Sequence, residues 1–181
     1  MTGRKPRTLN AGELWTYSLR ILGGRAHSIG EMREKLKRRA AQAGDVEDTL
    51  HRLKECGYLN DQRYAEGFAS ARLANDQFGK GRVIQDLRQH RIAPALAERA
   101  AQKVYEDVNE QTLIDEWIRR KYRSALREGL FHEEKDFASA YRRLLRAGFR
   151  PGEILRALKR FAANPELLDG FEPPEEPMEE V

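Results

Sequence analysis

Apolar residues recur at helical spacing in nine short segments, and this recurrence constrains the fold more than any other feature of the sequence. In each segment, apolar side chains three or four positions apart define one face, as Val46, Leu50 and Leu53 do. The segments lie at residues 10–23, 28–39, 45–57, 60–79, 83–92, 94–104, 113–122, 137–145 and 151–161. Because helices this short are marginal alone, we expect them to pack on one another.

The composition favours helices throughout the chain. Ala, Leu, Arg, Lys, Glu and Gln make up 101 of the 181 residues, whereas Val, Ile and Thr together make up 17. No apolar run approaches the roughly 18 residues that indicate a membrane-spanning helix. Residues 1–10 are basic without an apolar segment behind them, unlike a secretory signal. We therefore expect an all-α, monomeric, cytoplasmic protein with no β-sheet and no membrane contact.

Helix start signals stand where the apolar segments begin. Asn10 with Glu13, and Ser28 with Glu31, have the spacing of capping boxes. Asp45 is expected to cap the third helix. The fourth has two candidate caps, Asn60 and Asp61, and Pro94 and Pro151 suit the first positions of two later helices.

The helices group in threes, which predicts three tandem three-helix repeats in an elongated array. We place the first repeat at residues 11–59, the second at 60–108 and the third at 109–163, with residues 1–10 and the Pro-rich residues 164–181 disordered. Four residues of the second repeat have counterparts 57 positions later in the third repeat. Three of these four pairs are similar in character and one is not. The like pairs are Leu87 and Leu144, Ile92 and Phe149, Pro94 and Pro151; the unlike pair is Leu96 and Glu153.

Charge is divided unevenly along the chain. Residues 1–163 hold 33 basic and 22 acidic side chains, a net charge of +11. Residues 164–181 hold seven acidic side chains and no basic one, so the whole-chain value of +4 conceals a strongly basic body. Such a body attracts polyanions or an acidic protein surface.

One segment resembles the signature of a known protein family. Residues 57–68 read GYLNDQRYAEGF, and Arg72 follows four residues later. This stretch is similar to the signature segment of the RecX family of bacterial RecA regulators. The family pattern there is Gly, an aromatic residue, Leu, Asp or Asn, Asp, any residue, Arg, an aromatic residue, Ala, any two residues, an aromatic residue and, four positions later, Arg. Residues 81–88 and 144–149, with Ile154 and Leu158, extend the resemblance to roughly residues 12–163. The chain departs from the family at Arg91, where Gly is common, in the loop before Gly44 and in the acidic tail.

The resemblance implies three tandem three-helix repeats that form an elongated, curved array. It also implies a regulatory protein of DNA repair and the SOS response that binds the RecA–DNA filament. Inhibition of strand exchange, ATP hydrolysis and co-protease activity would follow, with weaker binding to single- and double-stranded DNA.

No pattern of catalytic or metal-binding residues stands out. The four histidines are dispersed, and the Gly79-Lys80-Gly81 turn is too short to be a phosphate-binding loop. The single cysteine, Cys56, excludes a disulfide framework, and we expect it to be a small buried residue. We therefore predict neither an enzyme nor a cofactor.

The candidate binding residues are basic. The family motif supplies Arg63 and Arg72, and charge clustering adds Arg88, Arg119, Arg120, Lys121, Arg142 and Arg143. Any one of them is also explained by salt bridges on a solvated helix face. As clusters they suit phosphate or carboxylate, because the guanidinium fork pairs with both. Trp15, Phe68, Trp117 and Tyr122 are expected in the core.

Two functions remain open. The basic surface either directs the protein to a recombinase filament or makes it an autonomous, sequence-nonspecific DNA-binding protein. Autonomous binding falls steeply with salt, whereas a filament regulator binds far more tightly when RecA is present. The acidic tail adds the hypothesis of mild autoinhibition, since a tethered polyanion competes with phosphate for the basic body.

Overall fold

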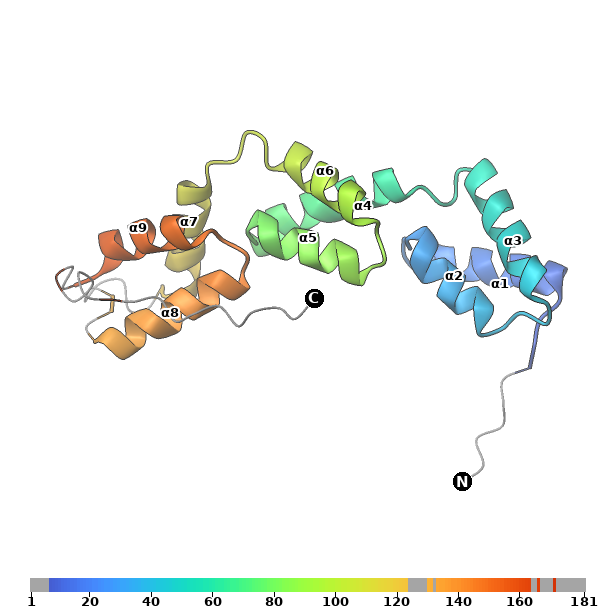
Figure 1. Ribbon diagram of the computed structural model, residues 1–181, viewed down its shortest axis with the longest axis horizontal. Helices are drawn as coiled ribbons and strands as arrows, with labels where there is room; N and C mark the ends of the chain where they lie inside the picture. The colour runs from blue at the N-terminus through green and yellow to red at the C-terminus, as the bar shows by residue number, and fades with distance from the viewer. Residues whose placement is uncertain (1–6, 124–129, 132, 164–165, 167–170, 172–181) are drawn as a thin grey trace, which may run out of the picture. The chain divides into compact units, whose positions relative to one another are not determined.

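The computed structural model describes residues 7–123, 130–131, 133–163, 166 and 171. Within these residues the chain forms nine α-helices and one π-helical turn, with two isolated β-bridges and no strand (Figure 1). The predicted all-α class is therefore confirmed. No described helix is long and apolar enough to cross a membrane.

Two compact units make up the chain, and each is described by itself. The first contains residues 1–72 and 83–106, and the second contains residues 73–82 and 107–181. The division passes through helix α5 (Lys80–Gln89), so the first turn of that helix belongs to the second unit.

The first repeat packs three helices around one core. They are α1 (Ala11–Gly24), α2 (Ile29–Lys37) and α3 (Ala43–Glu55), and each contacts the other two. Their shared core consists of large aliphatic side chains: Leu14, Met32, Leu36, Val46, Leu50, Leu53 and Leu59. Both predicted capping boxes form, at Asn10 and at Ser28.

The second repeat brings two of its helices together through alanines. Helix α4 (Asp61–Ala71) packs on α6 (Pro94–Val104), and α5 completes the repeat. Ala65, Ala69, Ala97 and Ala101 are fully buried, which lets the two backbones approach closely. The helix predicted to reach Gly79 ends earlier, because the chain passes into a π-helical turn at Arg72–Asp76.

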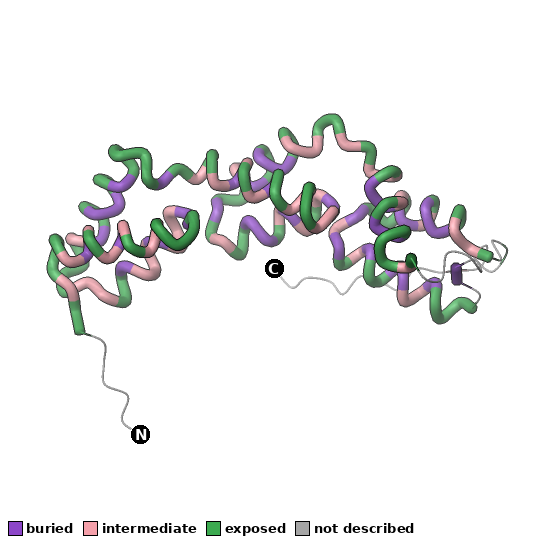
Figure 2. Tube along the Cα trace, turned by 180° about the vertical axis from the view of Figure 1, so that it is seen from behind, coloured by how far each residue is buried: buried purple, intermediate pink, exposed green. Residues whose placement is uncertain are grey.

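The third repeat has the most aromatic core. It consists of α7 (Glu110–Lys121), α8 (Glu134–Arg146) and α9 (Pro151–Phe161), and α9 packs on both of the others. Trp117, Phe137 and Tyr141 are buried among the aliphatic residues of these helices. Figure 2 shows that each described helix is buried along one side and exposed along the other, as the sequence periodicity predicts.

Three other local predictions are wrong. Cys56 is exposed, because it follows the last buried turn of α3 and lies off the apolar stripe. Helix α3 begins at Ala43 rather than after Asp45, so Asp45 lies in the first turn. Helix α5 ends at Gln89 instead of reaching Ile92, because Arg91 adopts a left-handed conformation with φ of 63°.

Most residues of the predicted terminal segments, 1–10 and 164–181, lie outside the described residues. Phe171 is an exception. Its ring lies edge-on to Phe137 and Tyr141, with centroid separations of 4.7 Å and 5.6 Å.

Candidate partner-binding surfaces

The family-like motif holds the first two repeats together. The Asp61 carboxylate accepts a hydrogen bond of 2.8 Å from the backbone N–H of Ile29, the first residue of α2. The Ser28 hydroxyl, which caps α2, donates to the carbonyl oxygen of His90 at 2.5 Å. Asn60 is the N-cap of α4, so Asp61 serves the other repeat instead of its own helix.

Glu31 lies at the centre of this contact. Arg25 donates to both carboxylate oxygens, at 3.1 Å and 3.3 Å. His90 contacts Oε1 through Nδ1 at 2.9 Å, and His27 contacts Oε2 through Nδ1 at 3.1 Å. One carboxylate therefore orients side chains from the loop before α2 and from the end of α5.

Burial and hydrogen bonding act in opposite directions on Glu31. Burial alone would raise the pKa of its carboxyl, but the bonds from Arg25, His90 and the Ser28 N–H outweigh it and hold the pKa at about 2. Burial, reinforced by the charge of Arg25, lowers the pKa of His27. Glu31 is consequently ionised and His27 neutral at pH 7.

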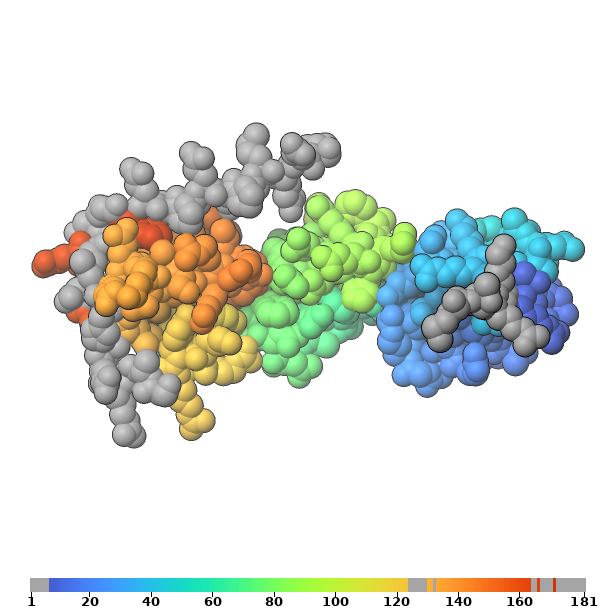
Figure 3. Space-filling model, turned by 90° about the horizontal axis from the view of Figure 1, so that it is seen from below, coloured from blue at the N-terminus to red at the C-terminus, as the bar shows by residue number. Residues whose placement is uncertain are grey.

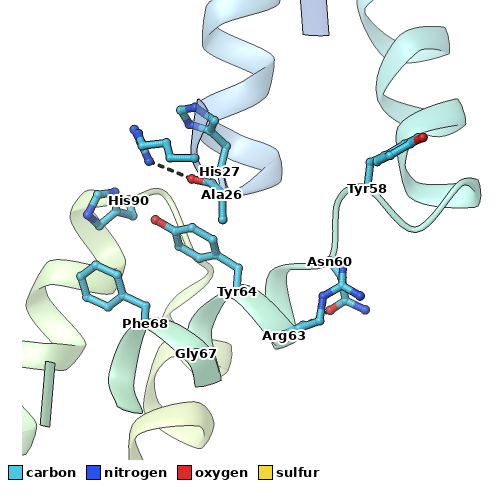
Figure 4. Close-up of a pocket in the computed structure, with 10 residues that line it drawn as sticks. Ala26, His27, Tyr58, Asn60, Arg63, Tyr64, Gly67, Phe68 and His90 are labelled. Carbon is cyan, nitrogen blue, oxygen red and sulfur yellow. Dashed lines mark hydrogen bonds between the residues drawn. The ribbon is translucent and has the colours of Figure 1, made fainter. Parts of the chain in front are cut away.

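An open pocket of about 390 Å³ lies beside this network, entirely within the first unit. Its lining combines aromatic rings with basic and amide side chains: Arg25, Ala26, His27, Tyr58, Asn60, Arg63, Tyr64, Gly67, Phe68 and His90. Figure 4 shows the rings of Tyr64, Phe68 and His90 close together, with Tyr58 apart from them on the turn that leads into α4.

The three predicted residues of the first unit have different surroundings. Arg63 is exposed, lines the pocket and donates to the carbonyl oxygen of Gly57 at 2.8 Å. Arg72 is half-buried, with its guanidinium 5.0 Å from the Phe68 ring and 3.6 Å from Asp86. Arg88 forms an exposed ion pair of 2.8 Å with Glu98. Arg72 and Arg88 therefore have structural partners within the second repeat.

A basic hollow of about 720 Å³ lies in the second unit and is lined by Arg119, Arg120, Arg123 and Phe161. The guanidinium of Arg119 lies 5.7 Å from the Phe161 ring. Arg120 donates to the carbonyl oxygens of Asn75 and Asp76, which fixes its position. Because none of the described residues that line the hollow carries a carboxylate, it suits an anionic group.

The remaining predicted residues are exposed. Lys121 is the last residue of α7, and Arg142 and Arg143 lie on α8. Figure 3 shows α8, in orange, forming much of the visible face of the third repeat. The structure thus brings Arg119 and Arg120 together, whereas Arg63 lines a separate pocket.

Sequence reasoning missed most of the pocket. Tyr58 is exposed, and its role could be suspected from the motif, but Arg25 and His90 lie far from the motif in sequence. Phe161 ends the predicted helical segment at residues 151–161, and nothing in the sequence marks it as a binding residue. The described residues contain no group of His, Cys, Asp and Glu that could hold a metal ion.

Comparison with known proteins identifies the family. Residues 15–53 match the family model described as the first three-helix domain of RecX, and residues 60–100 match that of the second. A protein from Deinococcus radiodurans called "Regulatory protein RecX" is 33% identical over 163 residues, covering 88% of this chain and 74% of the relative. The chain belongs to the RecX family. It is therefore a member of a family of regulatory proteins.

Other RecX proteins agree with this assignment. The regulatory protein RecX of Syntrophotalea carbinolica is 28% identical over 117 residues, which cover 65% of this chain and 74% of the relative. The crystal structure of RecX from Lactobacillus salivarius superposes with a TM-score of 0.65 at 16% identity, covering 83% of this chain and 96% of that one. The structural likeness concerns the fold of tandem three-helix domains.

Proposed function

We propose that this protein binds a RecA–DNA filament and lowers its recombinase, ATPase and co-protease activities. Membership of a family named for regulation supports a non-catalytic role. Under this proposal it acts in the cytoplasm as a monomer, and it contacts DNA alone more weakly than it contacts the filament.

The basic hollow of the third repeat carries the proposal. Among the described residues, three arginines and no carboxylate line it, and exposed Lys121 follows Arg120 in the sequence. Phosphate and acidic side chains both pair with such a surface. The eight predicted basic residues remain candidates for this contact, and Arg119 and Lys121 are both exposed.

Charge reversal at the hollow tests the proposal. The double variant Arg119→Glu, Lys121→Glu changes the charge of the surface. Arg120 is not substituted, because it donates to backbone carbonyl oxygens of the preceding repeat and its loss would disturb the fold. We expect this variant to bind RecA filaments on single-stranded DNA at least about tenfold more weakly in co-sedimentation, since each lost charge contact costs roughly 1 kcal/mol or more. Its helical circular dichroism should be unchanged.

The matched control makes the same change of charge elsewhere. Lys54 and Arg99 are exposed on α3 and α6, so Lys54→Glu with Arg99→Glu should leave filament binding nearly unaltered. Equal weakening by both variants would show a general charge effect and would contradict a specific role for the hollow.

The second candidate function is autonomous DNA binding, which the same carboxylate-free hollow also favours. The two functions differ in what RecA adds. Equal affinity for bare single-stranded DNA and for the filament, with a steep dependence on salt, would favour autonomous binding. Much tighter binding to the filament would favour regulation.

A further inference from the structure

The pocket beside Glu31 combines aromatic side chains with guanidinium groups. Four rings line it, from Tyr58, Tyr64, Phe68 and His90, together with the guanidinium groups of Arg25 and Arg63. None of the described residues that line it carries a carboxylate. A ligand that matches this lining carries both a flat ring and a negative charge.

The pocket is held in shape before any ligand arrives. Glu31 fixes Arg25 and His90, and the ring of His90 lies edge-on to Phe68 with a centroid separation of 5.0 Å. Tyr64 stacks on Phe68 with a separation of 6.1 Å. Little ordering is therefore required when a ligand binds, which favours affinity.

Tyr58 and Arg63 both line the pocket and are exposed to solvent. Tyr58 is 52% exposed, the largest exposure of any large apolar side chain in the described part of the chain. Its ring has an edge-on neighbour in Trp15, at 6.3 Å, and this arrangement steadies it on the surface. Arg63 donates through Nη2 to Gly57, and the exposed guanidinium has further N–H groups to offer.

The size of the pocket limits the ligand. A volume of about 390 Å³ lies near the lower end of the roughly 300–1,000 Å³ typical of small-ligand pockets. It suits one nucleotide unit rather than a double helix, whose bases are stacked and do not offer their faces. An acidic peptide would use the two guanidinium groups but would leave the exposed Tyr58 ring without a function.

We propose that this pocket binds one nucleotide of single-stranded DNA, with the base against Tyr58 and the adjacent phosphate against Arg63. The inference rests on the DNA contact in the proposed function and gives it a specific site. Aromatic stacking combined with a basic contact to the backbone is how proteins hold single strands without reading their sequence.

Binding of a short fluorescent oligothymidylate to the full chain, without RecA, tests the site. Tyr58→Ala should weaken binding about tenfold, the loss associated with one stacked base, and leave the salt dependence unchanged. Tyr58→Phe keeps the ring and should bind within about twofold of wild type. Arg63→Gln should reduce the slope of log affinity against log salt by about 0.7, as expected for one lost single-strand phosphate contact.

A control and a second signal locate the binding. Arg38 is exposed outside the pocket, so Arg38→Gln makes the same charge change as Arg63→Gln and should leave both affinity and slope unaltered. Trp117→Phe leaves Trp15 as the single tryptophan, next to Tyr58. Its fluorescence should change on addition of oligothymidylate, and Tyr58→Ala should abolish most of that change.

Wild-type affinity in both Tyr58→Ala and Arg63→Gln, with unchanged melting temperatures, would overturn the proposal. Binding of a free nucleoside monophosphate or an acidic peptide without binding of the oligonucleotide would overturn it as well. Because RecA is absent, failure here leaves filament binding standing, and failure of the filament assays leaves this site untouched.

Discussion

Glu31 is the residue on which the contact between the first two repeats most depends. It completes the capping box of α2 and at the same time binds Arg25, His27 and His90. Sequence analysis predicts the capping box from the spacing of Ser28 and Glu31. The contact with His90 joins residues 59 positions apart, so no local pattern indicates it.

Glu31→Gln should lower the free energy of unfolding at pH 7 by about 1.5–3 kcal/mol, the range for hydrogen bonds to a charged group. The wild-type protein should also lose stability as pH falls from about 4.5 to about 2, because the folded carboxyl has the lower pKa and the unfolded state binds the proton first. Chemical denaturation across this pH range measures both effects, and the variant should have a flatter profile.

His27 adds a second pH dependence of folding stability, in the same direction as that of Glu31. Its pKa is lowered in the folded state, so the unfolded state takes up the proton first as pH falls below about 6.5, and the free energy of unfolding decreases.

Glu34→Gln is the matched control for Glu31→Gln. Glu34 lies on the same helix but forms only a long ion pair of 3.9 Å with Lys37. If it flattened the acid profile as much as Glu31→Gln, the assignment to Glu31 would be wrong.

At the scale of helices, the ends of α5 and α8 show how the repeats correspond. Arg91 and Gly148 are separated by the predicted offset of 57, and both have positive φ, 63° and 88°. In each case the following apolar residue donates back into the helix, Ile92 to Leu87 and Phe149 to Leu144. The absence of Gly at position 91 therefore does not change the helix end.

Gly30 compensates for the side chain of Arg91. A Cβ atom on Gly30 would lie 2.5 Å from the Cβ of Arg91 and 2.9 Å from its carbonyl oxygen. The second unit contains a similar close contact between glycine and a helix end. There, the backbone N–H groups of Gly79 and Gly81, at the N-terminus of α5, donate to the carbonyl oxygens of Ala147 and Gly148. Small residues on one side of each contact thus permit the backbones to approach.

Gly30→Ala should destabilise the protein by about 1–3 kcal/mol, the usual cost of forcing an extra methyl into a packed contact. Arg91→Gly should recover part of that loss in the double variant, because it removes one of the two atoms in conflict. Thermal unfolding of the four proteins in this cycle measures the coupling.

Gly44 supplies the comparison, since it lies in α3 with open space where a Cβ would be. Gly44→Ala should leave stability unchanged or raise it by about 0.5–1 kcal/mol. A Gly30→Ala variant as stable as Gly44→Ala would contradict the close approach of α2 to Arg91.

Sequence periodicity predicts the helices well and their ends less well. The capping boxes at Asn10 and Ser28, and the prolines that open α6 and α9, depend on neighbouring residues and are confirmed. The π-helical turn at Arg72–Asp76 has no comparable local signal. For the candidate sites, the clustering of basic residues in the sequence indicates Arg119 and Arg120. The pocket beside Glu31 depends on contacts between the first two repeats, so no local sequence pattern predicts it.

At the scale of the whole molecule, the basic body and the acidic tail are the main electrostatic feature. Residues 1–163 have a net charge of +11, and seven acidic side chains follow them. A tether can hold these acids at an effective concentration in the range of about 1 mM or more near the body. The autoinhibition hypothesis therefore remains a prediction to be tested by truncation.

Ending the chain after Phe171 removes five of the seven acidic side chains and keeps the ring that packs on Phe137. The shortened protein should bind DNA more tightly at low salt, with a melting temperature close to that of the full chain. The difference should shrink as salt screens both contacts. Identical affinity at low salt would show that residues 172–181 do not compete with DNA.

The regulatory account is tested most directly by ATP hydrolysis on preformed RecA filaments on single-stranded DNA, titrated with this protein. We expect the steady-state rate to fall as the protein is added, and Arg119→Glu with Lys121→Glu to require a markedly higher concentration for the same effect. An ATPase rate that stays constant up to equimolar protein, with the protein folded and present, would contradict the account.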